Sequence, residues 1–405
     1  MNKKVISAML AASMAVSLAA CGSTATSEAS SAVSSETSST VASGESAASG
    51  SYTGTPIKVG GIGPITGAAA TYGNAVKNAE ELAVKEINAA NGSDVFDWKF
   101  EDDEHDAEKS VNAYNSLKDW GMQVLAGPVT TTPTLAVAAE SVNDNMFVLT
   151  PSASAQTVIE TGDNVFQICF TDPNQGVGAA DYMAENFAGA KVAIIYRNDD
   201  AYSQGIRDTF VKEATDKGAF EVVYQGTFTN DTASDFSVQL AGAQNAGADL
   251  VFLPIYYQPA SIIFSQAKAM GYAPTFFGVD GMDGILTMPG FDASLAEGLM
   301  LMTPFSATDE ANQAFVDAYT AAYGTEPNQF AADAYDGVYI VKAALEAAGC
   351  TADMSNEEIC DALVSAMTSL KFTGLTGTDM TWNAEGQVSK APTAYVVKDG
   401  QYVKG

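Results

Sequence analysis

Arginine and histidine are almost missing from this chain of 405 residues, which has two arginines, Arg197 and Arg207, and one histidine, His105. This scarcity argues against a Ser-His-Asp triad, a histidine-rich metal site and a site built on an arginine cluster. Basic residues are few altogether, because 19 lysines and arginines stand against 49 acidic residues and the formal net charge is −30. Nucleic acids and anionic membranes attract basic surfaces, so we expect neither as an electrostatic partner.

Sequence motifs of enzymes and of resident cofactors are also missing. The glycine-rich turn at 60–67 lacks the lysine of a phosphate-binding loop, and Pro64 interrupts a dinucleotide-binding pattern. There is no nucleophile elbow, and the acidic run at 101–106 lacks the spacing of a calcium loop, so we interpret it as a solvated strand end. We therefore predict no catalytic residue, no cofactor and no metal, with a secreted hydrolase as the least favoured alternative.

Long apolar runs are confined to the N-terminus, so we expect no membrane span further along the chain. Residues 1–4 are basic and residues 5–20 are apolar and small, a pattern typical of a secretory signal peptide at 1–20. The segment ends Leu-Ala-Ala-Cys21-Gly, which resembles the bacterial lipoprotein box and predicts a lipid on Cys21. The alternative is an ordinary signal peptide with an incidental cysteine.

The next stretch, 21–51, consists almost entirely of Ser, Ala, Thr, Gly and Glu, and cannot bury an apolar core. We interpret it as a disordered linker between a lipid anchor and a globular body. Four cysteines are present, of which Cys350 and Cys360 could form a disulfide outside the cytoplasm. A chance pair of free thiols explains them equally well, and Cys169 lies in an apolar run typical of a core.

The globular body alternates strand-like and helix-like segments, which predicts parallel sheets covered by helices. In the first half the expected strands are 57–62, 97–101, 123–126 and 146–149. From 165 the alternation restarts, with expected strands at 165–170, 191–196, 221–227, 249–255, 275–279 and 298–304. The predicted fold class is therefore α/β, with two doubly wound parallel-sheet lobes.

Two short runs, Gly-Pro-Val-Thr-Thr-Thr-Pro-Thr at 127–134 and Thr-Pro-Ser-Ala-Ser at 150–154, each follow an expected strand and lead into a helix-like segment. Their prolines fit a first helical turn, and their hydroxyls and free N–H groups could bind an anion. On neighbouring parallel strands, both turns would meet at the carboxyl edge of the sheet, where open α/β sheets bind ligands. The alternative is ordinary helix capping.

The second lobe offers different chemistry at the same kind of edge. Tyr256 follows one expected strand and can pack on a ligand, whereas Asp280 follows another and can pair with a cation. An anion site in one lobe and a carboxylate with aromatic rings in the other suit a zwitterion, so the sequence favours an amino acid as ligand.

From Ile57 to the C-terminus the chain resembles the branched-chain amino acid-binding proteins of ABC importers, which have the type I periplasmic binding protein fold. The supporting residues are Ile-Lys-Val-Gly-Gly-Ile-Gly-Pro-Ile-Thr-Gly at 57–67, Tyr72-Gly73, Asp102-Asp103, Gly127, Thr-Pro-Ser-Ala-Ser at 150–154, Tyr202 and Gln-Ala-Lys-Ala-Met-Gly at 266–271. The resemblance covers the whole globular body.

This resemblance implies a set of ligand contacts: Tyr72, Thr131, Ser152, Ala153, Ser154, Tyr202, Tyr256 and Asp280. Asp280 aligns with an acidic ammonium ligand that is often Glu in the family. His105 and Thr130 align where some members carry a disulfide, which cannot form here. The resemblance also implies three crossings between the lobes, near Thr171, near Thr303 and near 373–377. Lobe 1 is then expected at 52–171 plus 304–373, and lobe 2 at 172–303 plus 374–405.

The leading interpretation is a lipid-anchored binding protein on the extracellular face of the cell membrane. It would be a monomer that delivers an amino acid, branched-chain or otherwise apolar, to an ABC permease and ATPase complex. Two alternatives remain within the same fold: a ligand-binding sensor without a transport partner, and a receptor for an amide or a small carboxylate.

Overall fold

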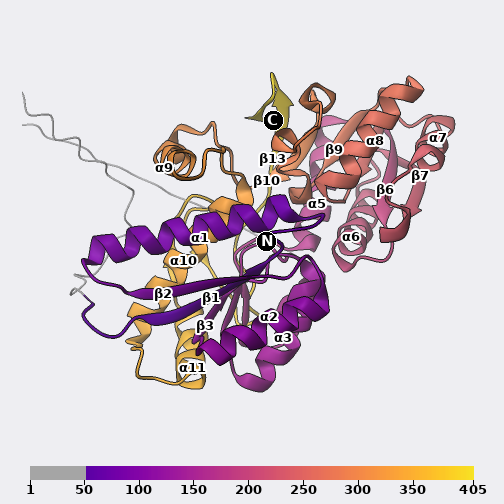
Figure 1. Ribbon diagram of the computed structural model, residues 1–405. Helices are drawn as coiled ribbons and strands as arrows, with labels where there is room; N and C mark the ends of the chain where they lie inside the picture. Colours follow the sequence, from indigo (N-terminus) through magenta and orange to yellow (C-terminus); the bar gives the residue numbers. More distant parts are fainter. Residues whose placement is uncertain (1–51) are drawn as a thin grey trace, which may run out of the picture. The chain divides into compact units, whose positions relative to one another are not determined.

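Two large β-sheets organise residues 52–405, the part of the chain that the computed structural model describes (Figure 1). The expected signal peptide at 1–20, the lipidated Cys21 and the linker at 21–51 lie outside this range. Each sheet has helices on both faces, which confirms the predicted α/β class with parallel sheets in two lobes.

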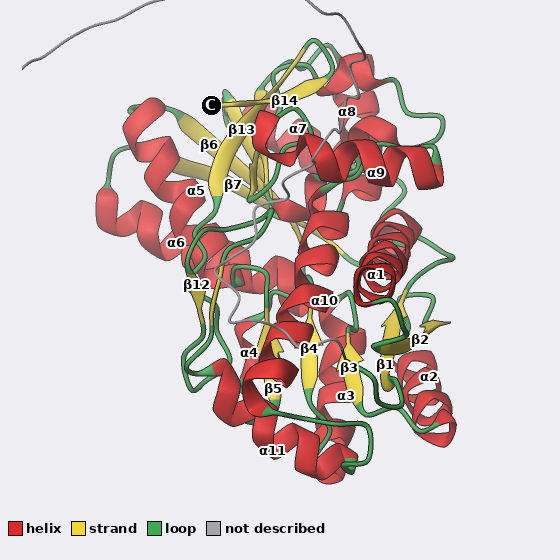
Figure 2. Ribbon diagram, turned by 90° about the vertical axis from the view of Figure 1, so that its left-hand side faces the viewer, coloured by secondary structure: helices red, strands yellow, loops and turns green. Residues whose placement is uncertain are grey.

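The first sheet is entirely parallel and has the strand order β2-β1-β3-β4-β5 (Figure 2). Its strands are β1 (Ile57–Gly63), β2 (Phe96–Asp102), β3 (Val124–Ala126), β4 (Val148–Thr150) and β5 (Val165–Gln167). Successive side chains of a strand point to opposite faces. Val59 therefore packs on one face of the sheet and Ile62 on the other, and both are completely buried.

Six helices cover the first sheet (Figure 1). The face with Val59 carries α1 (Ala70–Asn91), α10 (Gln329–Ala348) and α11 (Asn356–Met367). The opposite face carries α2 (Ala107–Trp120), α3 (Thr131–Asp144) and the single turn α4 (Gln156–Ile159).

The second sheet has the order β14-β13-β10-β9-β8-β6-β7. Five strands are parallel: β6 (Lys191–Arg197), β7 (Glu221–Phe228), β8 (Leu250–Leu253), β9 (Thr275–Gly278) and β10 (Met300–Thr303). The last two, β13 (Thr393–Lys398) and β14 (Gln401–Lys404), add an antiparallel edge. An antiparallel edge strand is common on an otherwise parallel sheet.

Helices also cover both faces of the second sheet. α5 (Asp172–Asn186) and α6 (Ala201–Lys217) pack on the face that carries Ile194. α7 (Ser237–Asn245) and α8 (Tyr257–Met270) pack on the face that carries Ile195. α9 (Gln313–Tyr323) lies against α1, so one apolar cluster runs continuously from the second sheet to helices of the first lobe.

The chain passes between the sheets after β5, after β10 and before β13. The last passage differs from the expected return near 373–377. Met380, Trp382 and Val388 pack in the core of the first sheet, and the Trp382 indole N–H donates to Gln167 O at 2.7 Å. The small hairpin of β11 (Lys371–Phe372) and β12 (Met380–Thr381) therefore belongs with the first lobe, and the chain joins the second sheet only at Thr393.

The possible Cys350–Cys360 disulfide is not formed: both are free thiols, and both lie in the apolar core of the first lobe. Burial raises the pKa of Cys350 above its usual value and that of Cys360 to about 12. Among the described residues, no helix is both long enough and apolar enough to cross a membrane.

Candidate functional site

The two hydroxyl-rich runs lie side by side at the carboxyl edge of the first sheet, as their strands predicted, because β3 and β4 pair in parallel. Side-chain hydrogen bonds join the runs. Thr150 Oγ1 donates to Pro128 O at 2.6 Å, and Ser152 Oγ donates to Val129 O at 2.7 Å. These bonds fix the turn after β4 against the turn after β3.

The same bonds alter the expected anion site. Thr150 Oγ1 also accepts the N–H groups of Ser152 and Ala153 at 3.4 and 3.0 Å, so these donors are engaged within the turn. Pro151 does not lie in a helical turn, because α4 begins only at Gln156. Of the N–H groups expected to be free at the second run, those of Ser152 and Ala153 are therefore engaged.

The start of α3 fits the prediction better. Pro133 occupies its first turn, and Thr131, its first residue, is 1% exposed. The preceding Thr130 contacts the only histidine, with 2.8 Å between His105 Nδ1 and Thr130 Oγ1. A hydrogen bond thus occupies the place that the family resemblance assigns to a disulfide. Burial, together with nearby Arg197, lowers the pKa of His105 to about 4, so its imidazole is neutral at pH 7.

Ser154 faces an aspartate that the sequence analysis did not select. Asp172, the first residue of α5, donates its N–H to Ser154 O at 2.8 Å and is 1% exposed. Neither carboxylate oxygen of Asp172 has a hydrogen-bond partner in normal geometry, and neither does Ser154 Oγ. Burial raises the pKa of Asp172 well above its usual value; the Ser154 hydroxyl opposes this shift, and Asp280 and Asp200 add to it.

The predicted cation ligand Asp280 lies in a buried 3₁₀ turn, Asp280–Met282, directly after β9. Its Oδ1 accepts the Tyr202 hydroxyl at 2.5 Å and the Gly281 N–H at 2.7 Å. A Cβ on Gly281 would lie 2.6 Å from the Tyr202 hydroxyl oxygen, so the close approach requires glycine. Burial raises the pKa of Asp280 to about 6, although the Tyr202 hydroxyl favours the charged form.

Aromatic rings from both lobes meet beside these carboxylates. Tyr72 of α1 packs edge-on against Tyr256 and Tyr257 of the second lobe, with ring centroids 5.3 and 5.0 Å apart. Its hydroxyl donates to Gly281 O. Tyr256 also packs against Tyr202 at 4.9 Å. The structure therefore brings Tyr72, Tyr202, Tyr256 and Asp280 into one cluster between the two sheets.

Asp200 adds a third acidic group to this region. It is 5% exposed, and its side chain accepts the Ser203 N–H at the start of α6. Burial raises its pKa, and the nearby Arg197 guanidinium opposes that shift. Three carboxylates thus lie within electrostatic range of one another, and a group with positive charge is the natural complement to them.

The chain matches the periplasmic binding protein family over residues 56–401, most of its length. It belongs to this family. A Leu/Ile/Val-binding protein homologue of Brucella melitensis is 31% identical over 312 residues, which are 76% of this chain and 82% of that one. The fold is accordingly that of the type I periplasmic binding proteins.

Solved structures of periplasmic binding proteins agree with this fold. The branched-chain amino acid transporter substrate binding protein LivJ of Streptococcus pneumoniae, in complex with isoleucine, is 28% identical with a TM-score of 0.75. The alignment covers 87% of this chain and all of that one. A solute binding protein of R. palustris in complex with benzoate has a TM-score of 0.76 at 22% identity, over 86% of this chain and 95% of that one. At that identity the likeness concerns the fold alone.

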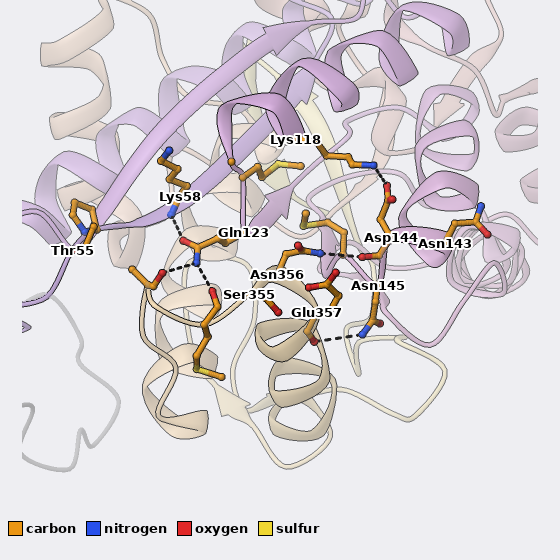
Figure 3. A pocket seen from close by; sticks show the side chains of 16 residues that line it. Thr55, Lys58, Lys118, Gln123, Asn143, Asp144, Asn145, Ser355, Asn356 and Glu357 are labelled. Atoms are coloured by element: carbon orange, nitrogen blue, oxygen red, sulfur yellow. Dashed lines mark hydrogen bonds and ion pairs between the residues drawn. The ribbon is translucent and has the colours of Figure 1, made fainter.

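A cavity of about 610 Å³ lies elsewhere in this periplasmic binding protein, away from the predicted site (Figure 3). Lys58 and Gln123 line it at the amino ends of β1 and β3, the edge opposite to the predicted site. Its polar groups bond to one another: Gln123 accepts the Lys58 N–H at 3.1 Å, and Asn356 donates to Asp144 O at 2.9 Å. None of the buried side-chain polar atoms found without a hydrogen-bond partner in the described residues lies in this lining, so nothing there requires a ligand.

Sequence reasoning missed Asp172 and Tyr257. Thr171-Asp172-Pro173 is typical of a helix start, and Thr171 does cap α5, so no local feature distinguishes the Asp172 carboxylate from an ordinary residue of a helix start. A signal was nevertheless available, because Asp172 stands at an expected crossing between lobes. Tyr257 follows Tyr256 directly and donates its hydroxyl to Ala68 O of the first lobe at 3.1 Å.

Proposed function

We propose that this chain is the solute-binding protein of an ABC importer and holds an amino acid with an apolar side chain between its two lobes. The observation that carries the proposal is Asp172, a buried carboxylate without a hydrogen-bond partner, beside the equally unpartnered Ser154 hydroxyl. A buried charge requires a partner, and an α-ammonium group placed between Asp172, Ser154 and Asp280 supplies one.

The remaining parts of an amino acid also find suitable surroundings. The start of α3, with Thr131, offers N–H groups and a positive helix end to the α-carboxylate. The rings of Tyr72, Tyr202 and Tyr256 give an apolar side chain a surface to pack on. The relatives named for leucine, isoleucine and valine support an amino acid of this kind.

A benzoate-like ligand, as in one structural neighbour, is the second candidate within the fold. The charges of the site disfavour it. Asp172, Asp200 and Asp280 are all buried carboxyl groups with a raised pKa, and an aromatic carboxylate would add a further negative group without supplying a cation to any of them. An uncharged amide would likewise leave Asp172 without a cation.

The test is a thermal-shift screen of residues 52–405 against amino acids, amides and small carboxylic acids, including benzoate. A ligand that binds only the folded state raises the melting temperature by mass action. We expect stabilisation by apolar amino acids and none by uncharged amides or by benzoate. Stabilisation by benzoate alone would overturn the amino-acid assignment, whereas the absence of any shift would count against a solute receptor.

We further propose that the chain is anchored at the outer face of the cell membrane through a lipid on Cys21, and that it works with a permease and an ATPase. The support is the Leu-Ala-Ala-Cys21 pattern ahead of the linker at 21–51. Mass spectrometry of the mature N-terminus should find a diacylglyceryl cysteine; a mature protein that begins at another residue would contradict the anchor. A sensor of the same fold would differ in having no permease and ATPase genes beside it.

A further inference from the structure

Gln329, the first residue of α10, makes three hydrogen bonds to parts of the chain that are distant in sequence. Its N–H donates to Asp283 Oδ2 at 2.7 Å, and its side-chain Nε2 donates to Asp280 O at 2.7 Å. Its Oε1 accepts the Thr303 hydroxyl at 3.2 Å. Gln329 is 2% exposed, so no bulk water competes for these bonds.

These bonds cross from one lobe to the other. The later turns of α10, with Val338 and Val341, pack in the core of the first sheet. Asp280 and Asp283 instead follow β9 of the second sheet, and Thr303 ends β10 of the same sheet. The N-terminus of a first-lobe helix therefore holds the turn of the second lobe that contains the proposed ammonium ligand.

Asp283 is placed to favour this contact electrostatically. It is 2% exposed and sets a carboxylate against the positive end of a helix of 20 residues. Its other oxygen accepts the Gly284 N–H at 2.8 Å, which orients the side chain. Gly284 has a φ of 96°, and a Cβ there would lie 2.7 Å from Thr71 Cγ2 of α1, so glycine allows the turn to approach the first lobe.

We infer that Gln329 and Asp283 form a closing latch, which positions the Asp280 turn for ligand binding when the two lobes meet. The inference rests on the proposed function and deepens it. Both are positioning residues: they bind the backbone of the turn and the end of α10, and they leave the Asp280 side chain to the ligand. Where opening of the lobes breaks these bonds, they stabilise the closed form, and they therefore slow ligand release more than they change ligand encounter.

The competing explanation is that these bonds merely cap α10. The chain offers a matched control, because Asn328 caps the same helix from within its own lobe by accepting the Ala331 N–H at 3.1 Å. Asn328→Ala removes a cap but no bond between lobes. Gln329→Ala and Asp283→Ala remove bonds between lobes, and Asp283→Asn keeps an acceptor while removing the charge.

The experiment measures association and dissociation rates of the amino acid found in the screen, by stopped-flow fluorescence, for the four variants and the wild type. We expect Gln329→Ala and Asp283→Ala to raise the dissociation rate at least about tenfold, as for loss of a hydrogen bond to a charged or buried group. Association rates should stay within about twofold of the wild type. Asp283→Asn should recover part of the loss, and Asn328→Ala should lower the melting temperature without changing dissociation.

Equal dissociation rates in all variants, or an equally large effect of Asn328→Ala, would overturn the latch. Small-angle scattering of the ligand-free variants tests it independently of any ligand, since loss of the latch should increase the radius of gyration of the body at 52–405. If no ligand is found, the proposed function fails, but scattering still decides about the latch. Identical radii for the wild type, Gln329→Ala and Asp283→Ala would then reject it.

Discussion

Lys390 Nζ lies 2.6 Å from Asp333 Oδ1, and the two side chains are only 2% and 4% exposed. Lys390 Nζ also donates to Thr376 Oγ1 at 2.6 Å. Lys390 lies on the stretch that carries the chain into β13, whereas Asp333 lies on α10, so a buried ion pair ties the last passage between the lobes to the first lobe. Burial raises the pKa of Asp333 to about 6, and the Lys390 ammonium opposes the shift.

This pair predicts a strong asymmetry between single and double substitution. Lys390→Met should lower the free energy of unfolding by about 3–5 kcal/mol, because it leaves Asp333 buried without a cation. The double variant Lys390→Met with Asp333→Leu removes both charges and should recover most of that loss. Urea denaturation of the wild type, both single variants and the double variant measures the coupling. A loss below about 1 kcal/mol for Lys390→Met would contradict it, since that is the range of exposed ion pairs.

Replacing the Asp172 carboxylate should raise the stability of the ligand-free protein, whereas replacing Lys390 should lower it. Asp172→Asn removes, at nearly constant volume, a buried carboxyl group whose charged form is disfavoured by burial, so we expect the ligand-free protein to gain about 1–3 kcal/mol in its free energy of unfolding at neutral pH. The same change removes a proposed ammonium partner, so amino-acid binding should fall below detection in titration calorimetry. Asp208→Asn, at a side chain that is 62% exposed, is the matched control and should change neither quantity. A less stable Asp172→Asn variant would indicate that the carboxylate has a structural partner.

The sequence predicted the regular elements well where periodicity and end signals agree. The end signals around 107–120 agree with α2, where the Asp106 side chain accepts the Lys109 N–H and Gly121 ends the helix in a left-handed conformation. The strand expected at 275–279 is β9. Both depend on local chemistry that can be read from neighbouring residues.

The sequence predicted the structure less well where a contact with a residue distant in the chain determines the local conformation. Thr150 could bond its own turn or leave the turn open to an anion, and the contact with Pro128 that settles this comes from another strand. Trp382 could join either lobe, and its place depends on a bond to Gln167 O. Asp172 has the local sequence pattern of a helix start, and only the three-dimensional structure shows that its carboxylate lacks a partner. Tertiary contacts decide these cases, and no local pattern encodes them.

The raised pKa of Asp172 also predicts a pH dependence. Because burial holds its folded-state pKa well above the unfolded value of about 3.9, the folded chain retains a proton that the unfolded chain releases. Its contribution to stability is therefore complete below about pH 4 and is lost as the pH rises through the folded-state pKa. Relative to Asp172→Asn, the ligand-free wild type should lose stability as the pH rises from about 4 towards the folded-state pKa of Asp172, and the contributions of the other carboxyl groups cancel in this difference. Urea denaturation at several pH values measures the gap, and a gap independent of pH would contradict the shift.

Asp280 gives the most direct test of how the ligand is recognised. Removing one partner of a buried charge pair leaves the other uncompensated and costs about 3–5 kcal/mol. Asp280→Ala should therefore weaken amino-acid binding roughly 100- to 5,000-fold, at 1.4 kcal/mol for each factor of ten. The fold should persist, because the contacts of this turn with Gln329 and Met282 use backbone atoms of the strand end and not the carboxylate.

The alternative is that the Asp280 carboxylate only orders its own turn, since its Oδ1 accepts the Gly281 N–H and the Tyr202 hydroxyl. Tyr202→Phe separates the two explanations, because it removes that hydroxyl and keeps the charge. If Asp280 reads the ammonium group, Tyr202→Phe should bind the amino acid far better than Asp280→Ala does in titration calorimetry. If the turn alone matters, both variants should lose affinity together. Binding by Asp280→Ala within about threefold of the wild type, about 0.7 kcal/mol, would show that the charge pair is not made.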